Sequence, residues 1–241
     1  MSAYLWFELV RIVRAPQLMM FTVVMPVASY VVFSAVSSGT DYGISMQAVM
    51  MIGLAGYGAL IGVLSTAASV SNERTQGWLR QLRVTPLRPR HVVVVKTIIS
   101  TLVAIPSIVA VGLAGYLQHG ITLSPVRWLA VVALLWLGTV PFALLGLAMG
   151  YALPPNIASS ASFLTFFSLS VLGGLLIPIE AFPRGMQHFA HVLPSNRYAE
   201  LGWSAAGGHM PSGMGVAVLA AWTGVFLVLA IVAYRRSAAT R

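Results

Sequence analysis

The chain has 241 residues, of which 58% are hydrophobic and only 8% are charged. Soluble domains carry about 25% charged residues, and a soluble fold this apolar would expose large hydrophobic patches, so the composition excludes a water-soluble protein. The formal net charge of +9 could suit a nucleic-acid partner, but the charges lie between long uncharged stretches, which membrane topology explains better. The absence of cysteine excludes disulfides and thiolate metal sites.

Residues 1–17 predict an amphipathic helix that lies along the membrane surface. Leu5, Leu9 and Ile12 recur at helical spacing, while Glu8 falls on another face. Such a helix buries its apolar face at the boundary between headgroups and acyl chains. The alternative is a frayed leader. Because Glu8 interrupts the early apolar residues and no small-residue cleavage site follows, we expect no cleaved signal peptide.

Six stretches are apolar enough to cross a bilayer, which takes about 20 residues of helix. The sequence therefore predicts an all-α polytopic membrane protein that forms a single domain over residues 1–241. Pro26, Pro106 and Pro141 fall inside these stretches, where neighbouring helices can satisfy the backbone groups that proline leaves unpaired. The predicted spans are residues 18–36, 46–70, 92–117, 128–153, 157–177 and 215–234.

Positive charge marks one side of the predicted bundle. Eleven of the 14 Lys and Arg residues fall in the N-terminal arm, around the connection between the second and third spans, or after the sixth span. An even number of spans places these three regions on one side, and cytoplasmic loops carry an excess of Lys and Arg. Both termini are therefore expected in the cytoplasm. Arg outnumbers Lys thirteen to one, which suits a GC-rich genome and a bacterial cytoplasmic membrane.

The basic connection at residues 71–91 predicts a short amphipathic helix between two tight turns. Gly77 can end the helix of the second span, and Trp78, Leu79 and Leu82 then share one face. Thr85 and the prolines that follow end this short helix. A segment held in this way can transmit force, whereas a flexible loop would dissipate it. The alternative is an ordinary basic loop anchored by an interfacial tryptophan, and the residues alone favour neither.

The same segment resembles the signature of ABC-2 type permeases. In that family an acidic–Arg pair, a Gly, an apolar helix and a Thr-Pro-Leu-x-Pro turn precede a Lys in the third span; Lys96 matches that Lys. The resemblance implies that the segment is a coupling helix docking in a cleft on a separate ATPase. Arg88 and His91 depart from the usual small and acidic residues. The residues implied in ATPase coupling are Glu73, Arg74, Gly77, Trp78, Leu79, Leu82, Thr85 and Pro86.

Residues 178–214 resemble the external hairpin of the same family, and especially of the drug-resistance branch that includes daunorubicin and linearmycin exporters. There, short helices dip back toward the membrane before the last span. Four aromatic residues are expected at the interface as plugs, namely Phe182, Phe189, Tyr198 and Trp203. The whole hairpin is expected to form an outer lid. The alternative is a plain interfacial loop. The residues expected to form the external gate are Ile177, Pro178, Phe182 and Phe189.

Small and hydroxylated residues recur along two spans. Small residues let helices approach closely, and in the family these two spans line the path at the interface between paired permeases. The alternative is ordinary small-residue packing, and the sequence favours neither. The candidate path residues are Gly58, Gly62, Ser65 and Ser69 in the second span, and Ser162, Thr165 and Ser168 in the fifth.

No pattern in the chain predicts catalysis. Lys96 is the only ionisable residue inside a predicted span, and it is expected to snorkel to the cytoplasmic surface. An ion-coupled transporter would need buried acidic residues to carry the ion, and the predicted spans contain none. His188 and His191 are expected on a solvated face rather than at a metal. Because no phosphate-binding Gly-x-x-x-x-Gly-Lys-Ser/Thr motif occurs, we expect ATP and Mg to bind a partner chain and this chain to hold no cofactor.

The resemblance implies the permease subunit of an ATP-driven ABC exporter. Its expected partners are two copies of an ATPase subunit, a second permease copy that is identical or related, and membrane lipid. The implied cargo is a hydrophobic or amphipathic compound such as a drug, an antibiotic or a lipid-like molecule. Two alternatives stay open, namely a membrane scaffold or lipid-handling protein without an ATPase, and an ion-coupled transporter.

Overall fold

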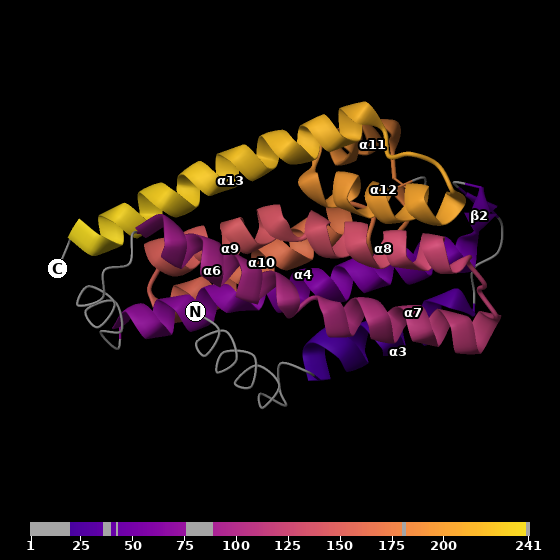
Figure 1. Cartoon of the computed structure of the whole chain (residues 1–241), viewed down its shortest axis with the longest axis horizontal. Coiled ribbons are helices and arrows are strands. Elements are labelled where there is room, and N and C mark those ends of the chain that lie inside the picture. The colour runs from indigo at the N-terminus through magenta and orange to yellow at the C-terminus, as the bar shows by residue number, and fades with distance from the viewer. Residues whose placement is uncertain (1–19, 36–39, 42, 76–88, 180–181, 240–241) are drawn as a thin grey trace.

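The computed structural model describes residues 20–35, 40–41, 43–75, 89–179 and 182–239, which are mostly helical (Figure 1). The predicted surface helix at residues 1–17 lies outside the described residues, as do residues 76–88 of the predicted coupling segment. In chain order the elements are a π-helical turn η1 (Met20–Val24), α3 (Met25–Ser34), β1 (Thr40–Asp41), β2 (Ile44–Ser45), α4 (Met46–Thr75), α6 (Pro89–Leu102), α7 (Ile105–His119), α8 (Pro125–Gly138), α9 (Val140–Ala152), α10 (Pro155–Leu172), α11 (Arg184–Val192), α12 (Pro194–Gly207) and α13 (Gly213–Ala239).

Among the described residues, five helical stretches are long and apolar enough to cross a membrane, judged by length and composition. They coincide with the second to sixth predicted spans. The first predicted span corresponds to a shorter apolar helix at Met20–Ser34, and its predicted start lies outside the described residues. The structure therefore agrees with an all-α polytopic membrane protein, while the first crossing stays a prediction. The five stretches are Met46–Thr75, Val93–His119, Pro125–Ala152, Pro155–Leu172 and Gly213–Ser237.

Three prolines mark where the long helices are interrupted. Proline lacks a backbone donor and its ring collides with the carbonyl four residues earlier, so the regular helix stops just before it. Pro106 follows a turn at residues 103–104 that separates α6 from α7, and Pro141 follows Thr139, which separates α8 from α9. Pro26 follows the π-helical turn η1. The third and fourth predicted spans are therefore each built from two consecutive helices.

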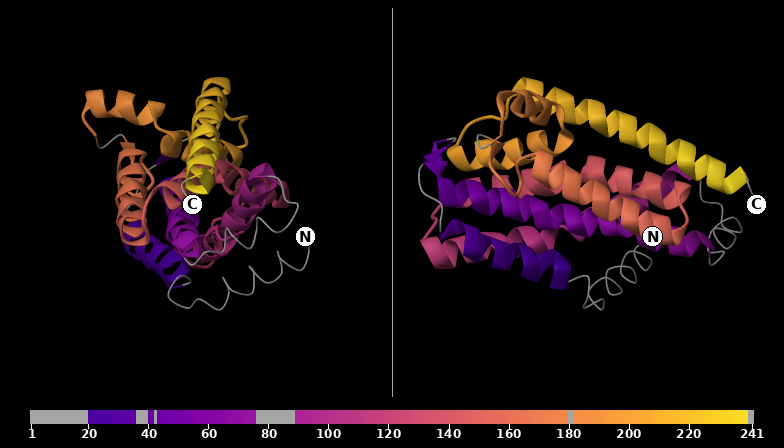
Figure 2. Two further views of the ribbon diagram at one scale, coloured as in Figure 1. Left: turned by 90° about the vertical axis from the view of Figure 1, so that its left-hand side faces the viewer. Right: turned by 180° about the vertical axis from the view of Figure 1, so that it is seen from behind.

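Helix α4 forms the centre of the bundle. The helices run side by side along the longest axis of the molecule, with α13 along the outside (Figures 1 and 2). α4 contacts α3, α7, α9 and α10, and 83% of its most apolar stretch is buried, against 22% for α10 and for α13. Protein therefore surrounds α4, whereas α10 and α13 turn apolar faces outward, as helices in contact with lipid or with a second membrane subunit do.

The connection from α10 to α13 contains α11 and α12, and α12 runs alongside α8 (Figure 1). Tyr198 is 0% exposed and its ring contacts Phe142 at a centroid distance of 5.5 Å. Trp203 is 3% exposed and its Nε1 donates to the Val49 carbonyl at 3.0 Å. The prediction that both rings plug the interface is wrong, because α12 inserts between helices instead of covering them. This burial raises the pKa of the Tyr198 phenol above its ordinary value.

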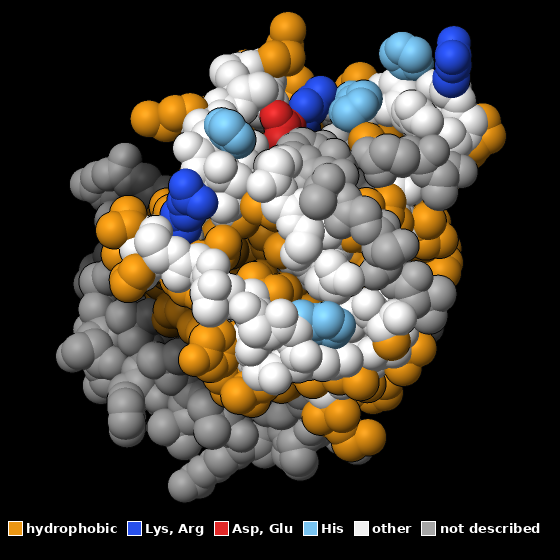
Figure 3. All heavy atoms as spheres, turned by 90° about the vertical axis from the view of Figure 1, so that its right-hand side faces the viewer, with side chains coloured by type: hydrophobic (Ala, Val, Ile, Leu, Met, Phe, Trp, Pro, Cys, Tyr) orange, Lys and Arg blue, Asp and Glu red, His pale blue; other side chains and the backbone are white. Residues whose placement is uncertain are grey.

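Polar side chains cap the end of the molecule near α11 and α12. The strands β1 and β2 pair in antiparallel fashion there. Figure 3 looks onto this end and shows histidine and arginine side chains around its rim, with hydrophobic side chains covering the flanks of the bundle. An aqueous end and apolar flanks are the surfaces expected of a bundle whose axis crosses a membrane.

Candidate functional site

The other end of the bundle holds the charged residues that flank segment 76–88. Helix α4 ends at Thr75, whose hydroxyl donates to the Asn72 carbonyl at 2.9 Å, and α6 begins at Pro89. Of the predicted coupling residues, the structure describes Glu73 and Arg74. Those that lie outside the described residues are Gly77, Trp78, Leu79, Leu82, Thr85 and Pro86.

Glu73 and Lys96 form an ion pair that joins α4 to α6. The Lys96 Nζ donates to the Glu73 Oε2 at 2.6 Å, and the two side chains are only 8% and 14% exposed. The prediction that Lys96 snorkels to the membrane surface is wrong, because Glu73 on the neighbouring helix neutralises it where it stands. Removing one partner of a buried pair costs about 3–5 kcal/mol, since the other charge is left uncompensated. The pair therefore holds together the two helices from which segment 76–88 departs.

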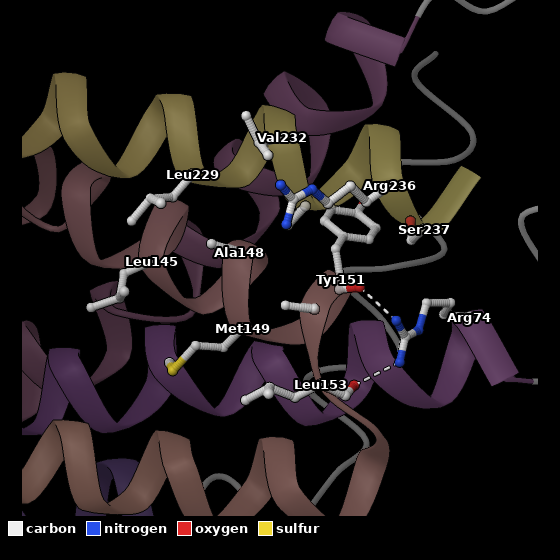
Figure 4. Close-up of a pocket in the computed structure, with 12 residues that line it drawn as sticks. Arg74, Leu145, Ala148, Met149, Tyr151, Leu153, Leu229, Val232, Arg236 and Ser237 are labelled. Atoms are coloured by element: carbon white, nitrogen blue, oxygen red, sulfur yellow. Dashed lines mark hydrogen bonds between the residues drawn. The ribbon is translucent and has the colours of Figure 1, made fainter. Parts of the chain in front are cut away.

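Arg74 ties α4 to the turn between α9 and α10. Its guanidinium donates to the carbonyl oxygens of Tyr151 at 2.5 Å and Leu153 at 2.8 Å (Figure 4). The Ser71 hydroxyl donates to the same Leu153 oxygen at 2.6 Å. The last carbonyls of a helix lack partners within it, and a cation there also meets the negative end of the helix dipole. Arg74 therefore fixes the end of α9 to the end of α4.

Together these contacts form what we call the joint, at the end of α4 where segment 76–88 begins. It consists of Ser71, Glu73, Arg74, Lys96 and the carbonyls of Tyr151 and Leu153. Because Glu73 holds α6 and Arg74 holds the end of α9, a displacement of the last turn of α4 would move all three helices together. The groups present are suited to holding helices, and the described part of the chain contains no cluster of three His, Cys, Asp or Glu side chains that could bind a metal ion. The arrangement can transmit motion.

The predicted path residues of α4 lie at two kinds of position. A Cβ added at Gly58 would collide with the Ser107 hydroxyl, and one at Gly62 would stand 3.0 Å from a side chain of the turn between α6 and α7. Within one chain these two glycines therefore serve close packing of α4 against its neighbours. Ser65 and Ser69 lie further along α4 and are half-buried. A role of all four in a path stays a prediction.

The predicted path residues of α10 face largely toward the protein. Ser162 is buried and donates to a backbone carbonyl one turn earlier at 2.7 Å. The Thr165 hydroxyl lies 3.8 Å from a methionine sulfur of α9, and Ser168 is half-buried. The outward face of α10 carries instead Phe163 and Phe167, whose rings stack with centroids 6.3 Å apart. The hydroxyl groups could reach a path only along the edges of this aromatic face.

The predicted external gate residues lie around the turn after α10 and on α11. Ile177 and Phe189 are 45% and 57% exposed. Pro178 and Phe182 are half-buried, and the Phe182 carbonyl accepts a hydrogen bond from the Gln187 amide at 2.8 Å. Their role as a gate stays a prediction.

Sequence reasoning missed the polar contacts that hold the hairpin. The Asn196 Nδ2 donates to the Gly173 carbonyl at 3.1 Å, and its Oδ1 lies 3.2 Å from the His191 Nδ1. Arg197 pairs with Glu200 at 2.6 Å and also donates to the His191 carbonyl. The run Pro-Ser-Asn at 194–196 is the signal that could have found them, because such residues start helices and bond to nearby backbone.

Known proteins resemble this chain in sequence. The sequence model of a family described as "ABC-2 type transporter" matches residues 1–201. The chain is also similar to a Bacillus subtilis (strain 168) protein named "Putative transport permease YvfS". The two are 25% identical over 225 residues, which cover 92% of this chain and 91% of the relative.

Proposed function

This chain belongs to the ABC-2 type transporter family and is the membrane permease of an ABC transporter, and from this premise we propose that it exports its cargo with a coupling helix at residues 77–84. Permeases of this family generally work with an ABC ATPase. We propose two ATPase copies and a second permease, so that closure of the ATPase pair on ATP moves two coupling helices at once. The chain itself is expected to bind neither ATP nor Mg.

The joint at the end of α4 is the observation that supports this proposal best. Segment 76–88 connects α4 to α6, and the Glu73–Lys96 pair at 2.6 Å holds these helices together beside it. Arg74 extends the connection to the end of α9. A displacement of the segment would therefore move α4, α6 and α9 together.

Replacing Trp78 and Leu82 by Asp (W78D/L82D) should lower the amount of ATPase that co-purifies with the permease at least tenfold. Each apolar side chain that leaves a buried interface loses about 1.5–3 kcal/mol, and the new charges are unpaired. The measurement is affinity purification of the full chain from native membranes, followed by quantification of the ATPase. Arg80→Gln serves as the control, because at helical spacing Arg80 falls on a different face of the segment from Trp78 and Leu82. Unchanged co-purification of the ATPase with W78D/L82D would refute docking through this segment.

The proposed orientation places both termini and segment 76–88 in the cytoplasm. Since the chain has no cysteine, single cysteines can report the side directly. Thr75 is exposed at the end of α4, and Met210 is 93% exposed between α12 and α13. A membrane-impermeant maleimide applied to intact cells should label Met210→Cys and spare Thr75→Cys until the cells are lysed. The reverse pattern would overturn the orientation and place the joint outside.

The cargo is proposed as an apolar or amphipathic compound that enters sideways from the lipid. The outward faces of α10 and α13 are apolar, so such a compound could reach the protein without crossing water. We propose that the transport path lies at the contact between the paired permeases, along the α10 hydroxyl groups and the half-buried serines of α4. An ion-coupled mechanism is disfavoured, because Glu73 is the single acidic residue in the five described candidate spans and it is paired.

A further inference from the structure

A pocket of about 540 Å³ lies between α9 and α13, beside Arg74 (Figure 4). This volume falls within the range of about 300–1,000 Å³ that is common for ligand pockets. Neither the family resemblance nor the coupling mechanism assigns an occupant to it. The residues that line it include Leu145, Ala148, Tyr151, Leu229, Val232 and Arg236.

The lining divides into an apolar part and a positively charged part. Leu145 and Ala148 of α9 face Leu229 and Val232 of α13, and the two α13 side chains are 47% and 40% exposed. The pocket therefore reaches the apolar outer surface of the bundle. Figure 4 shows the guanidinium of Arg236 directed into the space between the two helices. A pocket that is apolar along most of its length and positively charged at one end is complementary to an amphiphile with a negatively charged headgroup.

We propose that this pocket binds one anionic phospholipid, with an acyl chain between α9 and α13 and the phosphate at Arg236. Both helices belong to candidate membrane spans, so an acyl chain is the apolar molecule that meets them at the highest concentration. The guanidinium matches phosphate oxygens in a two-pronged geometry. Basic pockets between membrane helices near their ends are known to hold anionic headgroups.

Arg74 adds charge to the same site. It donates to the Tyr151 and Leu153 carbonyls and contributes positive potential, and both it and Arg236 line the pocket. The lipid would thereby fasten α13 to the end of α9 that Arg74 also holds. Bound lipid is then part of the joint, and the joint responds to the content of anionic lipid in the membrane. The assignment stands on the pocket and does not depend on ATPase docking.

The test uses phosphatidylglycerol with a diazirine in one acyl chain, added to the purified full-length chain in detergent. Illumination converts the diazirine to a carbene that inserts into neighbouring residues, and peptide mass spectrometry locates the label. We expect the label in residues 145–153 and 229–237. Unlabelled phosphatidylglycerol should compete, whereas phosphatidylcholine and glycerol phosphate should not. Competition by glycerol phosphate would assign the site to a free phosphate compound, and label spread evenly over α10 and α13 would show only an annular lipid coat; either result overturns the proposal.

Neighbouring arginines provide a matched pair of variants. Arg235 and Arg236 are both exposed, but only Arg236 lines the pocket. Arg236→Gln should weaken phosphatidylglycerol competition about fivefold, which corresponds to about 1 kcal/mol for one arginine at a membrane surface, and Arg235→Gln should leave it unchanged. Ala233→Phe should block labelling by filling the pocket. Equal losses in the two arginine variants would contradict a specific site, and the label map of the unaltered chain decides the matter even if Ala233→Phe fails to fold.

Discussion

Replacing Lys96 by Glu is expected to abolish transport-coupled ATPase activity, and exchanging both charges (Glu73→Lys with Lys96→Glu) is expected to restore much of it. The single change sets two carboxylates against each other where the native atoms lie 2.6 Å apart, in side chains that are 8% and 14% exposed. Loss of a buried partner costs about 3–5 kcal/mol, which corresponds to roughly 200- to 5,000-fold in the population of the intact joint. The measurement is ATPase activity of the reconstituted complex, with and without cargo.

The pair Arg197–Glu200 supplies the control for this experiment. It has the same 2.6 Å separation and similar exposure, 16% and 13%, but lies on α12 at the opposite end of the bundle. Glu200→Gln and Glu73→Gln each leave one cation without its carboxylate. Both should lower the thermal unfolding temperature, whereas only Glu73→Gln should uncouple ATP hydrolysis from cargo. Equal uncoupling by the two variants would mean that general instability, and not the joint, explains the effect.

Replacing Gly58 by Leu should prevent stable folding, and Gly58→Ala should already lower stability by about 1–3 kcal/mol, the usual effect of overpacking a well-packed core. The added Cβ would collide with the Ser107 hydroxyl and stand 2.8 Å from the Thr22 carbonyl oxygen, which belongs to backbone and cannot move aside like a flexible side chain. The measurement is thermal unfolding in detergent, followed by the fluorescence of the native tryptophans.

Gly224→Ala is the matched control, because Gly224 lies in the apolar helix α13 and its added Cβ would have no atom within 4 Å apart from the backbone of its own helix and its chain neighbours. Alanine is the better helix former by up to about 1 kcal/mol, so this variant should be as stable as the native chain or slightly more stable. If Gly58→Ala matched it, α4 would have room at this contact, and the assignment of Gly58 to helix packing would be wrong.

The charged joint shows how far sequence reasoning reached at the site. The motif pointed to Glu73 and Arg74 as coupling residues, and the structure places both at the root of the segment, on α4. Their partners could not be predicted, since Lys96 and the carbonyls of Tyr151 and Leu153 lie 23 to 79 residues away in sequence. Hydropathy treats a lysine near a span end as a snorkelling residue, and only the position of a neighbouring helix shows that it is neutralised instead.

The hairpin shows the opposite case. The family resemblance implied its short helices, but Tyr198 and Trp203 could equally be interfacial or core aromatics, because both carry an apolar ring and one polar atom. Their burial depends on α12 running beside α8. In the same way, Gly58 and Gly62 fit a path or a packing seam equally well until their neighbours are known.

By itself the sequence determined that this is a membrane protein, the approximate ends of the five described candidate spans and the family to which it belongs. These properties follow from composition, helix length and local motif, each of which acts over a few turns of chain. Only the tertiary structure decided which helix lies at the centre, which charges are paired and which face of α13 meets α9 in a pocket. Those outcomes depend on contacts between residues far apart in sequence, where small residues set how closely two helices approach and a single opposite charge changes where a lysine is stable.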